Sequence, residues 1–162
     1  MIEATLDEQI QQLEKALETD PSSKEFAALA DLYLAKNQPE KALSISQEGL
    51  DTHPNFMRGR YVLAKAYYAL GQFEQACEEL ENVRLFEPQN IDYLTLLGNA
   101  LLKLNQEDEA KEIFQEILDM DPLSGEARLN LSLLGENLPD VDDDEPEMES
   151  PDSDSWNADE PV

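Results

Sequence analysis

Prolines recur along this chain at an almost constant interval. Pro21, Pro54, Pro88 and Pro122 are separated by 33, 34 and 34 residues, and a polar residue precedes each of them. A period of this length indicates stacked supersecondary units, because each unit can bury its apolar face only against its neighbours. The repeat therefore constrains the fold more tightly than any single motif does.

Other residues keep the same register. Each unit is numbered from a position one, which is in turn Ser23, Met57, Ile91 and Gly125. Position seven is always leucine, position eight is small, position eleven is tyrosine or leucine, and position twenty is alanine. The residues, in that order, are Leu29, Leu63, Leu97 and Leu131; Ala30, Ala64, Gly98 and Ser132; Tyr33, Tyr67 and Leu101; and Ala42, Ala76 and Ala110.

Each unit is predicted to form two helices. In the first unit, apolar residues recur at spacings of three and four through Phe26, Leu29 and Tyr33, and again through Ala42 and Leu50. The small residue at position eight faces the alanine at position twenty, which lets the two backbones approach closely. Leucine and tyrosine at positions seven and eleven then fill the space between successive pairs.

Helix ends are predicted from residue type. The residue between the two helices of a unit is Asn37, Gly71 or Asn105, and these types tolerate the left-handed conformation that ends a helix. Pro39 fits the first turn of a helix, where its missing N–H costs nothing. Side-chain caps are expected at Ser22, which forms a capping-box pattern with Glu25, and at Asn90 and Ser124.

The combined pattern resembles the tetratricopeptide repeat family. It is clearest in LAKAYYALGQFEQACEEL, residues 63–80, and in LGNALLKLNQEDEAKEIF, residues 97–114. Position four departs from the family's tryptophan, and Ser46 replaces an aromatic residue at position twenty-four; the residues at position four are Phe26, Arg60 and Leu94. The resemblance implies an all-α solenoid of helix-turn-helix repeats that forms a right-handed superhelix.

The predicted solenoid occupies residues 1–137. Residues 5–19 align with the second helix of a repeat that lacks its first helix, and Gln9 stands where alanine is expected. Polar end helices of this kind keep solenoids soluble. The predicted segments are an N-terminal capping helix in 1–21, repeats in 23–56, 57–90 and 91–124, and a C-terminal capping helix in 125–137. Residues 138–162 hold eleven acids and no Lys or Arg, which predicts a disordered acidic tail.

Charge and cysteine content exclude several classes of function. The chain has 37 Asp and Glu against 11 Lys and Arg, a formal net charge of −26. This charge repels nucleic acid and anionic membranes, so neither is an expected partner. A single cysteine excludes an intramolecular disulfide and suits a reducing compartment. With no leader and no long apolar segment in the sequence, we expect a cytoplasmic protein that does not insert into a membrane.

Catalytic and metal-binding constellations are absent from the sequence pattern. His53 precedes Pro54 in a turn, and Cys77 lies beside Ala76 as a predicted packing residue, so a Cys–His dyad is the one catalytic pairing to consider. No cysteine pair, histidine pair or calcium loop occurs, and no metal or cofactor is expected. The run DVDDDEPE reads as a solvated acidic segment. We therefore predict that the protein is not an enzyme.

The resemblance places a peptide-binding groove on the first helices, at positions two, five, nine and twelve or thirteen. The second repeat then presents cations beside tyrosines, a mixture typical of recognition surfaces. Asn99 can bind a peptide backbone through both its donor and its acceptor. The alternative is that the tyrosines pack between repeats and the cations balance nearby acids. The predicted groove residues are Leu34, Arg58, Tyr61, Lys65, Tyr68, Asn99, Leu102, Lys103 and Leu133.

One subclass of the family binds the C-terminal carboxylate of heat-shock chaperones through Lys, Asn and Arg side chains. The equivalent positions here are Ala27, Asp31, Val62, Asp92 and Leu96, so that clamp is missing. The resemblance favours a scaffold or adaptor that binds a peptide or partner helix in its groove. The alternative is a small cytosolic chaperone that holds a secretion substrate before export. Self-association through the capping helices stays open.

Trp156, the only tryptophan, lies in the predicted acidic tail rather than in a core. It is the one large apolar anchor in that segment. Three roles stay open for the tail: an idle spacer, a docking motif for a basic protein, and an arm that occupies the groove beside Arg58 and Lys65.

Overall fold

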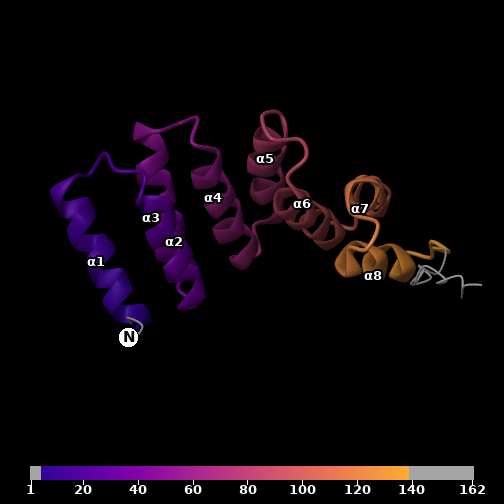
Figure 1. Cartoon of the computed structure of the whole chain (residues 1–162), viewed down its shortest axis with the longest axis horizontal. Helices are drawn as coiled ribbons and strands as arrows, with labels where there is room; N and C mark the ends of the chain where they lie inside the picture. Colours follow the sequence, from indigo (N-terminus) through magenta and orange to yellow (C-terminus); the bar gives the residue numbers. More distant parts are fainter. Residues whose placement is uncertain (1–4, 139–162) are drawn as a thin grey trace, which may run out of the picture.

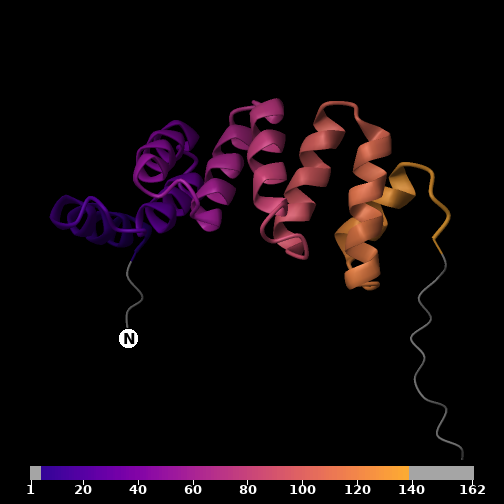
Figure 2. The ribbon, with the colours of Figure 1, turned by 90° about the horizontal axis from the view of Figure 1, so that it is seen from above.

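The computed structural model describes residues 5–138, and these residues form eight α-helices and no strand. The helices stack side by side in one row from α1 to α8 (Figure 1), and the row is curved when it is seen from above (Figure 2). The prediction of an all-α solenoid is confirmed. The bounds are α1 Leu6–Thr19, α2 Phe26–Ala35, α3 Pro39–Thr52, α4 Met57–Ala69, α5 Phe73–Arg84, α6 Ile91–Lys103, α7 Glu107–Met120 and α8 Gly125–Leu133.

The helices fall into two sets. The first helices of the repeats are α2, α4, α6 and α8, and the second helices are α1, α3, α5 and α7. Each second helix packs against the first helix that follows it, and α2, α4 and α6 also contact one another in series. The surface of α2, α4, α6 and α8 is called the first-helix face below. No helix in the described range is long and apolar enough to cross a membrane.

Small residues set the distance between paired helices, as the repeat predicts. Position eight is buried in the three complete repeats, and position twenty is fully buried in all three. A Cβ atom added to Gly98 at position eight would lie 2.7 Å from the Phe114 ring, which shows how closely α6 and α7 approach. Larger side chains at these positions would force the two helices of a repeat apart.

Phe26 takes the place of the family's tryptophan at position four and joins the first two repeats. The absence of a side chain at Gly49 on α3 leaves space that its ring fills. A Cβ atom on Gly49 would lie 2.2 Å from Cγ of Phe26, and one on Gly59 of α4 would lie 2.7 Å from its Cζ. The ring of Phe56 packs edge-on against Phe26, with ring centres 5.7 Å apart. Phe26 thus packs against both α3 and α4.

Several predicted helix ends are confirmed. Asn37, Gly71 and Asn105 have φ values of 57°, 74° and 58°, which places each in the left-handed region directly after a first helix. Pro39 begins α3. The side chain of Asn90 accepts a hydrogen bond from the backbone N–H of Tyr93 at 3.4 Å and caps α6.

The predicted caps at Ser22 and Ser124 are wrong, because neither α2 nor α8 has a side-chain cap hydrogen bond at its start. Ser22 donates its N–H and its hydroxyl to the Asp20 carboxylate, at 3.1 and 2.7 Å, and α2 begins only at Phe26. Ser124 makes no side-chain cap bond, while the Asp121 carboxylate accepts the N–H of Leu123 at 3.1 Å. The two aspartates thus accept hydrogen bonds within the turns that precede α2 and α8.

A capping box forms at the start of α1, where the sequence reading had not placed one. The N–H of Glu8 donates to the hydroxyl of Thr5 at 3.3 Å, and the N–H of Thr5 donates to the Glu8 carboxylate at 2.8 Å. The pattern of threonine followed three residues later by glutamate is the signal that predicts it. Both unpaired N–H groups are satisfied, so α1 has a defined start.

Candidate peptide-binding face

Asp31 on α2 organises the centre of the first-helix face. Its carboxylate accepts hydrogen bonds from Arg58 Nη2 at 2.7 Å and from Lys65 Nζ at 2.6 Å, both on α4. The side chain of Asp31 is only 21% exposed, whereas that of Arg58 is 59% exposed. Because two cations share one carboxylate, this cluster keeps one excess positive charge in a strongly acidic chain.

Tyrosines adjoin the ionic cluster. Lys65 Nζ lies 5.6 Å from the centre of the Tyr61 ring, and Tyr61 packs against Tyr93 of α6 with ring centres 4.5 Å apart. Burial, together with the carboxylates of Asp92 and Asp31, raises the pKa of Tyr61 to about 12. The Tyr61 hydroxyl therefore stays protonated even at pH values where an ordinary tyrosine begins to ionise.

The face continues through Tyr68 and Asn99. Tyr68 packs edge-on against Phe73, with ring centres 5.2 Å apart, and burial with the nearby charge of Glu126 raises the Tyr68 pKa. The amide of Asn99 donates to Glu126 of α8 at 2.8 Å and accepts from Asn130 at 3.5 Å. Asn99 thus uses its donor and its acceptor within the chain, and a peptide backbone would have to exchange with α8 there.

The other predicted groove residues are more dispersed. Leu34 and Leu102 are half-buried and pack against the two hydrophobic cores, while Lys103 is exposed. Leu133 is 76% exposed and lies on α8, the last first helix. The structure therefore brings Arg58, Tyr61 and Lys65 together and leaves Leu133 apart from them.

The observed contacts within the chain are those of the alternative interpretation. Tyr61 packs between repeats, and Arg58 and Lys65 both balance an acid. The role of Asp31 as the shared partner was missed, although its signal is present, because Asp31 and Lys65 both occupy position nine, 34 residues apart. Tyr93 was missed as well, since it stands at position three, outside the groove set.

An open cavity of about 580 Å³ lies at the N-terminal end of the same face. It is formed between α1 and α2, and Arg58 reaches it from α4. Leu13, Ala16, Ala28 and Leu32 supply its apolar lining, while Asp31 and Arg58 supply charge. The cavity is thus continuous with the ionic cluster.

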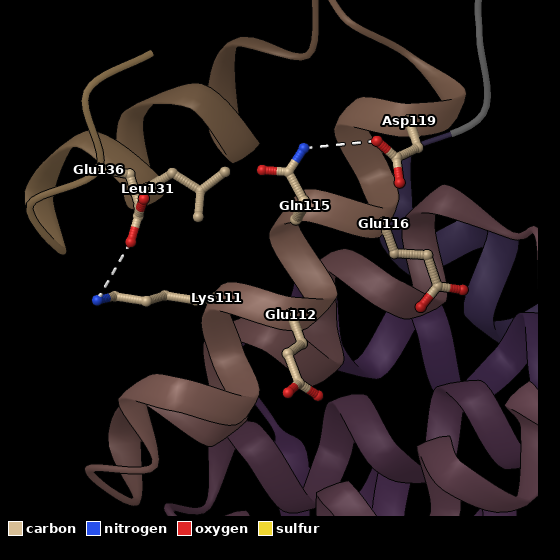
Figure 3. A pocket seen from close by; sticks show the side chains of 7 residues that line it. All are labelled: Lys111, Glu112, Gln115, Glu116, Asp119, Leu131 and Glu136. Atoms are coloured by element: carbon tan, nitrogen blue, oxygen red, sulfur yellow. Dashed lines mark hydrogen bonds and ion pairs between the residues drawn. The ribbon is translucent and has the colours of Figure 1, made fainter.

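A second cavity, of about 420 Å³, lies between α7 and α8 and is rich in carboxylates. Figure 3 shows Lys111 on α7 reaching Glu136, with 3.4 Å between Nζ and Oε1, while Glu112 and Glu116 point away from that pair. Within residues 5–138, no three His, Cys, Asp or Glu side chains converge as a metal site would require.

Cys77 and His53, the two residues considered for catalysis, both make packing contacts. Burial and the charges of Glu81 and Glu74 raise the pKa of the Cys77 thiol to about 11, so the reactive thiolate is scarce at neutral pH. His53 Nε2 lies 2.5 Å from the carbonyl oxygen of Ser22, and its ring stacks on Phe26 with centres 6.5 Å apart. Both side chains thus serve packing between helices.

A row of helical hairpins with one continuous face of first helices defines an α-solenoid interaction module. Two models of the tetratricopeptide repeat family match the chain, over residues 38–100 and 91–122. Together they span 85 of the 162 residues. The chain belongs to the tetratricopeptide repeat family.

Similar proteins agree with this assignment. Tetratricopeptide repeat protein 8 of Caenorhabditis elegans is 26% identical over 128 residues, which cover 79% of this chain and 25% of the relative. The chain thus spans about a quarter of that relative's length. The crystal structure of MamA superposes with a TM-score of 0.71 at 18% identity, covering 80% of this chain and 79% of MamA.

A third match was solved with a ligand. The second tetratricopeptide domain of human RPAP3, in complex with the HSP70 peptide SGPTIEEVD, superposes with a TM-score of 0.61 at 19% identity. The match covers 67% of this chain and 90% of that domain. At this identity the match shows that the two chains share a fold.

Proposed function

We propose that this chain is a non-catalytic interaction module that binds a peptide or helix of another protein across its first-helix face. The observation that carries the proposal is the pair of cations that share Asp31 beside the half-buried ring of Tyr61. A carboxylate of the partner can bind Arg58 and Lys65 through charge-assisted hydrogen bonds. The complex of human RPAP3 with an HSP70 peptide supports peptide binding by this fold.

Acidic residues near the ionic cluster restrict the kind of ligand that can bind there. Asp92 and Glu126 lie on the same face and raise the pKa values of Tyr61 and Tyr68, so a run of acids in the ligand would be repelled. Ala27 stands at one of the carboxylate-clamp positions and is fully buried. We expect a ligand with one internal acid for Arg58 and an apolar side chain that packs on the neighbouring tyrosine rings.

The proposal is tested with peptides selected by display on the full chain. The affinity of a selected fluorescent peptide is measured by anisotropy for the wild type and for the double variant Arg58→Glu with Lys65→Glu. Loss of two charge-assisted contacts predicts binding at least about tenfold weaker. Since a peptide library reports binding without a known partner, the experiment needs no prior identification of the ligand.

A matched control removes the general effect of charge. Lys36→Glu with Lys111→Glu changes the net charge by the same amount and also breaks two ion pairs, with Asp7 and Glu136, away from the cluster. This control is expected to bind within about twofold of the wild type. Equal affinity for both double variants would count against the proposed groove.

A second candidate function is a chaperone that holds an export substrate. Exposed apolar side chains favour it, since Leu85 and Phe86 after α5, and Leu123 after α7, are 79%, 67% and 70% exposed. Exposed apolar groups of this kind can hold an unfolded segment. Light scattering of an aggregating client would show protection that Leu85→Ser with Phe86→Ser abolishes, whereas an adaptor gives no protection with either chain.

A further inference from the structure

The N-terminal end of the solenoid presents an apolar surface that later repeats bury. At positions six and ten of α4, Val62 and Ala66 are fully buried in the core cluster that contains Ala27 and Ala30 of α2. No first helix precedes α2 in the described range. At the same two positions of α2, Ala28 is exposed and Leu32 is half-buried.

Helix α1 corresponds to the second helix of a repeat, and no first helix precedes it among residues 5–138. Its Leu13 and Ala16 occupy positions twenty-four and twenty-seven and are half-buried. The equivalent residues in α5 and α7 are at most 1% exposed; they are Leu80, Val83, Phe114 and Ile117. The cavity of about 580 Å³ lies between these two surfaces. This N-terminal slot, lined by Leu13, Ala16, Ala28 and Leu32, is the place that a first helix would fill.

The C-terminal end has the complementary incompleteness. Position five or nine of each earlier first helix contacts the next first helix: Asp31 contacts Arg58 and Lys65, Tyr61 contacts Tyr93, and Asn99 contacts Glu126 and Asn130. In α8 the same positions are Leu129 and Leu133, which are 60% and 76% exposed. No first helix follows α8 among residues 5–138. These two leucines therefore present an apolar edge at positions that, in α2, α4 and α6, include a residue in contact with the next first helix.

We propose that two copies of this chain associate head to tail, with α8 of one copy in the N-terminal slot of the next. The contact continues the packing of α2 on α4 and of α4 on α6 across the boundary between copies. It gives α8 a second helix, α1 of the next copy, and it gives α2 a preceding first helix. Within the chain, Asn99 at position nine of α6 contacts Asn130 at position six of α8. The same pairing across the boundary brings Leu133, at position nine, against Ala28, at position six of the next copy. Such a heterologous contact leaves one slot and one α8 free for further copies.

Charge predicts an unusual salt dependence for this association. The helix that receives α8 carries Asp7, Glu8, Glu14 and Glu18 against Lys15 alone, and the cavity beside α8 is lined mainly by carboxylates. Two acidic ends repel each other at low ionic strength, and salt screens that repulsion. The apolar contact itself does not weaken with salt. Association of two copies should therefore strengthen as the salt concentration rises. A basic helix from another protein would show the opposite dependence, because salt would weaken its attraction to the acidic slot.

The test is sedimentation velocity of the full chain at about 0.05 M and about 0.5 M NaCl. The account predicts concentration-dependent association that is stronger at the higher salt. Leu129→Glu with Leu133→Glu, and separately Ala28→Glu with Leu32→Glu, should each weaken it at least about tenfold. Leu85→Glu with Phe86→Glu makes the same chemical change at two exposed apolar residues elsewhere and should leave it unchanged.

Mixing the variants tests the direction of the contact, once circular dichroism at 222 nm has shown that each variant keeps the helical content of the wild type. The α8 variant keeps an intact slot, and the slot variant keeps an intact α8, so an equimolar mixture should form 1:1 dimers that grow no further. A mixture without dimers overturns the proposal, since it means that copies pair symmetrically or that another segment covers the slot. A full chain that stays monomeric at both salt concentrations overturns it as well.

Discussion

Gly49 lies inside α3, where the contact with Phe26 makes a clear prediction. An alanine Cβ at this position would lie 2.2 Å from Cγ of Phe26 and 2.3 and 2.4 Å from its two Cδ atoms. These atoms form the root of the ring, so the ring cannot avoid the methyl group by swinging its tip. Phe26 is only 3% exposed, and Gly59, His53 and Phe56 surround it.

The magnitude follows from two opposed effects. Glycine inside a helix is less favourable than alanine by about 0.5–1 kcal/mol, which by itself would stabilise the variant Gly49→Ala. Overpacking in a closed core costs about 1–3 kcal/mol. Because the clash is severe, we expect overpacking to win by about 1–2 kcal/mol, which lowers Tm by about 4–8 °C in a domain of this size.

Thermal unfolding followed by circular dichroism at 222 nm measures the effect. Gly125→Ala is the control, because nothing lies within 4 Å of a Cβ at that helix start, and it should change stability by less than about 0.5 kcal/mol. Phe26→Leu should make the alanine at position 49 less costly, which appears as a coupling energy in a double-mutant cycle. A Gly49→Ala chain as stable as the wild type would refute the close packing of Phe26 on α3.

Four further predictions follow from the same contacts. Ala76→Leu or Ala110→Leu, each at a fully buried position twenty, should cost about 1–3 kcal/mol in a thermal melt. Tyr33 donates a hydrogen bond to Glu14, which together with burial and the charge of Glu14 raises the Tyr33 pKa to about 12, above its ordinary value of 10.0. The folded state therefore holds the Tyr33 proton more tightly than the unfolded state does. The stability that this provides is fully present below pH 10 and is lost as pH rises toward 12. Thermal melts at increasing pH should show this decline for the wild type and a flatter decline for Tyr33→Phe. The raised pKa of Cys77 predicts slow alkylation by iodoacetamide at pH 8 and fast alkylation in urea. Trp156 lies outside the described residues; docking of the acidic tail in the groove predicts blue-shifted emission that Arg58→Glu with Lys65→Glu returns to the value for water, and water-like emission in both chains contradicts it.

The fold could be predicted from the sequence because the repeat is defined by residue types and spacings within each unit. The left-handed residues Asn37, Gly71 and Asn105 are marked by residue type, and the small residues at positions eight and twenty are marked by their spacing. The caps at Ser22 and Ser124 were wrong, and Asp20 and Asp121 accept hydrogen bonds in the turns before these helices instead. Whether a serine caps a helix depends on the geometry of the turn, which residue type alone does not determine.

The candidate site was less predictable, because its contacts join different repeats. The positions of Arg58, Tyr61 and Lys65 on one face follow from helical spacing. Their ion pairs with Asp31 and the ring contact with Tyr93 depend on how far α4 lies from α2 and from α6. The size of the packed side chains determines those distances. The partial neutralisation of the cations by Asp31 and the exposure of Leu133 could therefore be read only from the structure.

Binding of a partner through the first-helix face can be mapped residue by residue in a ¹H–¹⁵N NMR titration of the labelled full chain with a peptide selected on it. We expect shift changes concentrated at the amides of Arg58, Tyr61, Lys65 and Tyr68, with little change at Lys41 on α3 or Lys111 on α7. Changes centred on the second helices instead, with the amides of α4 unmoved, would contradict it.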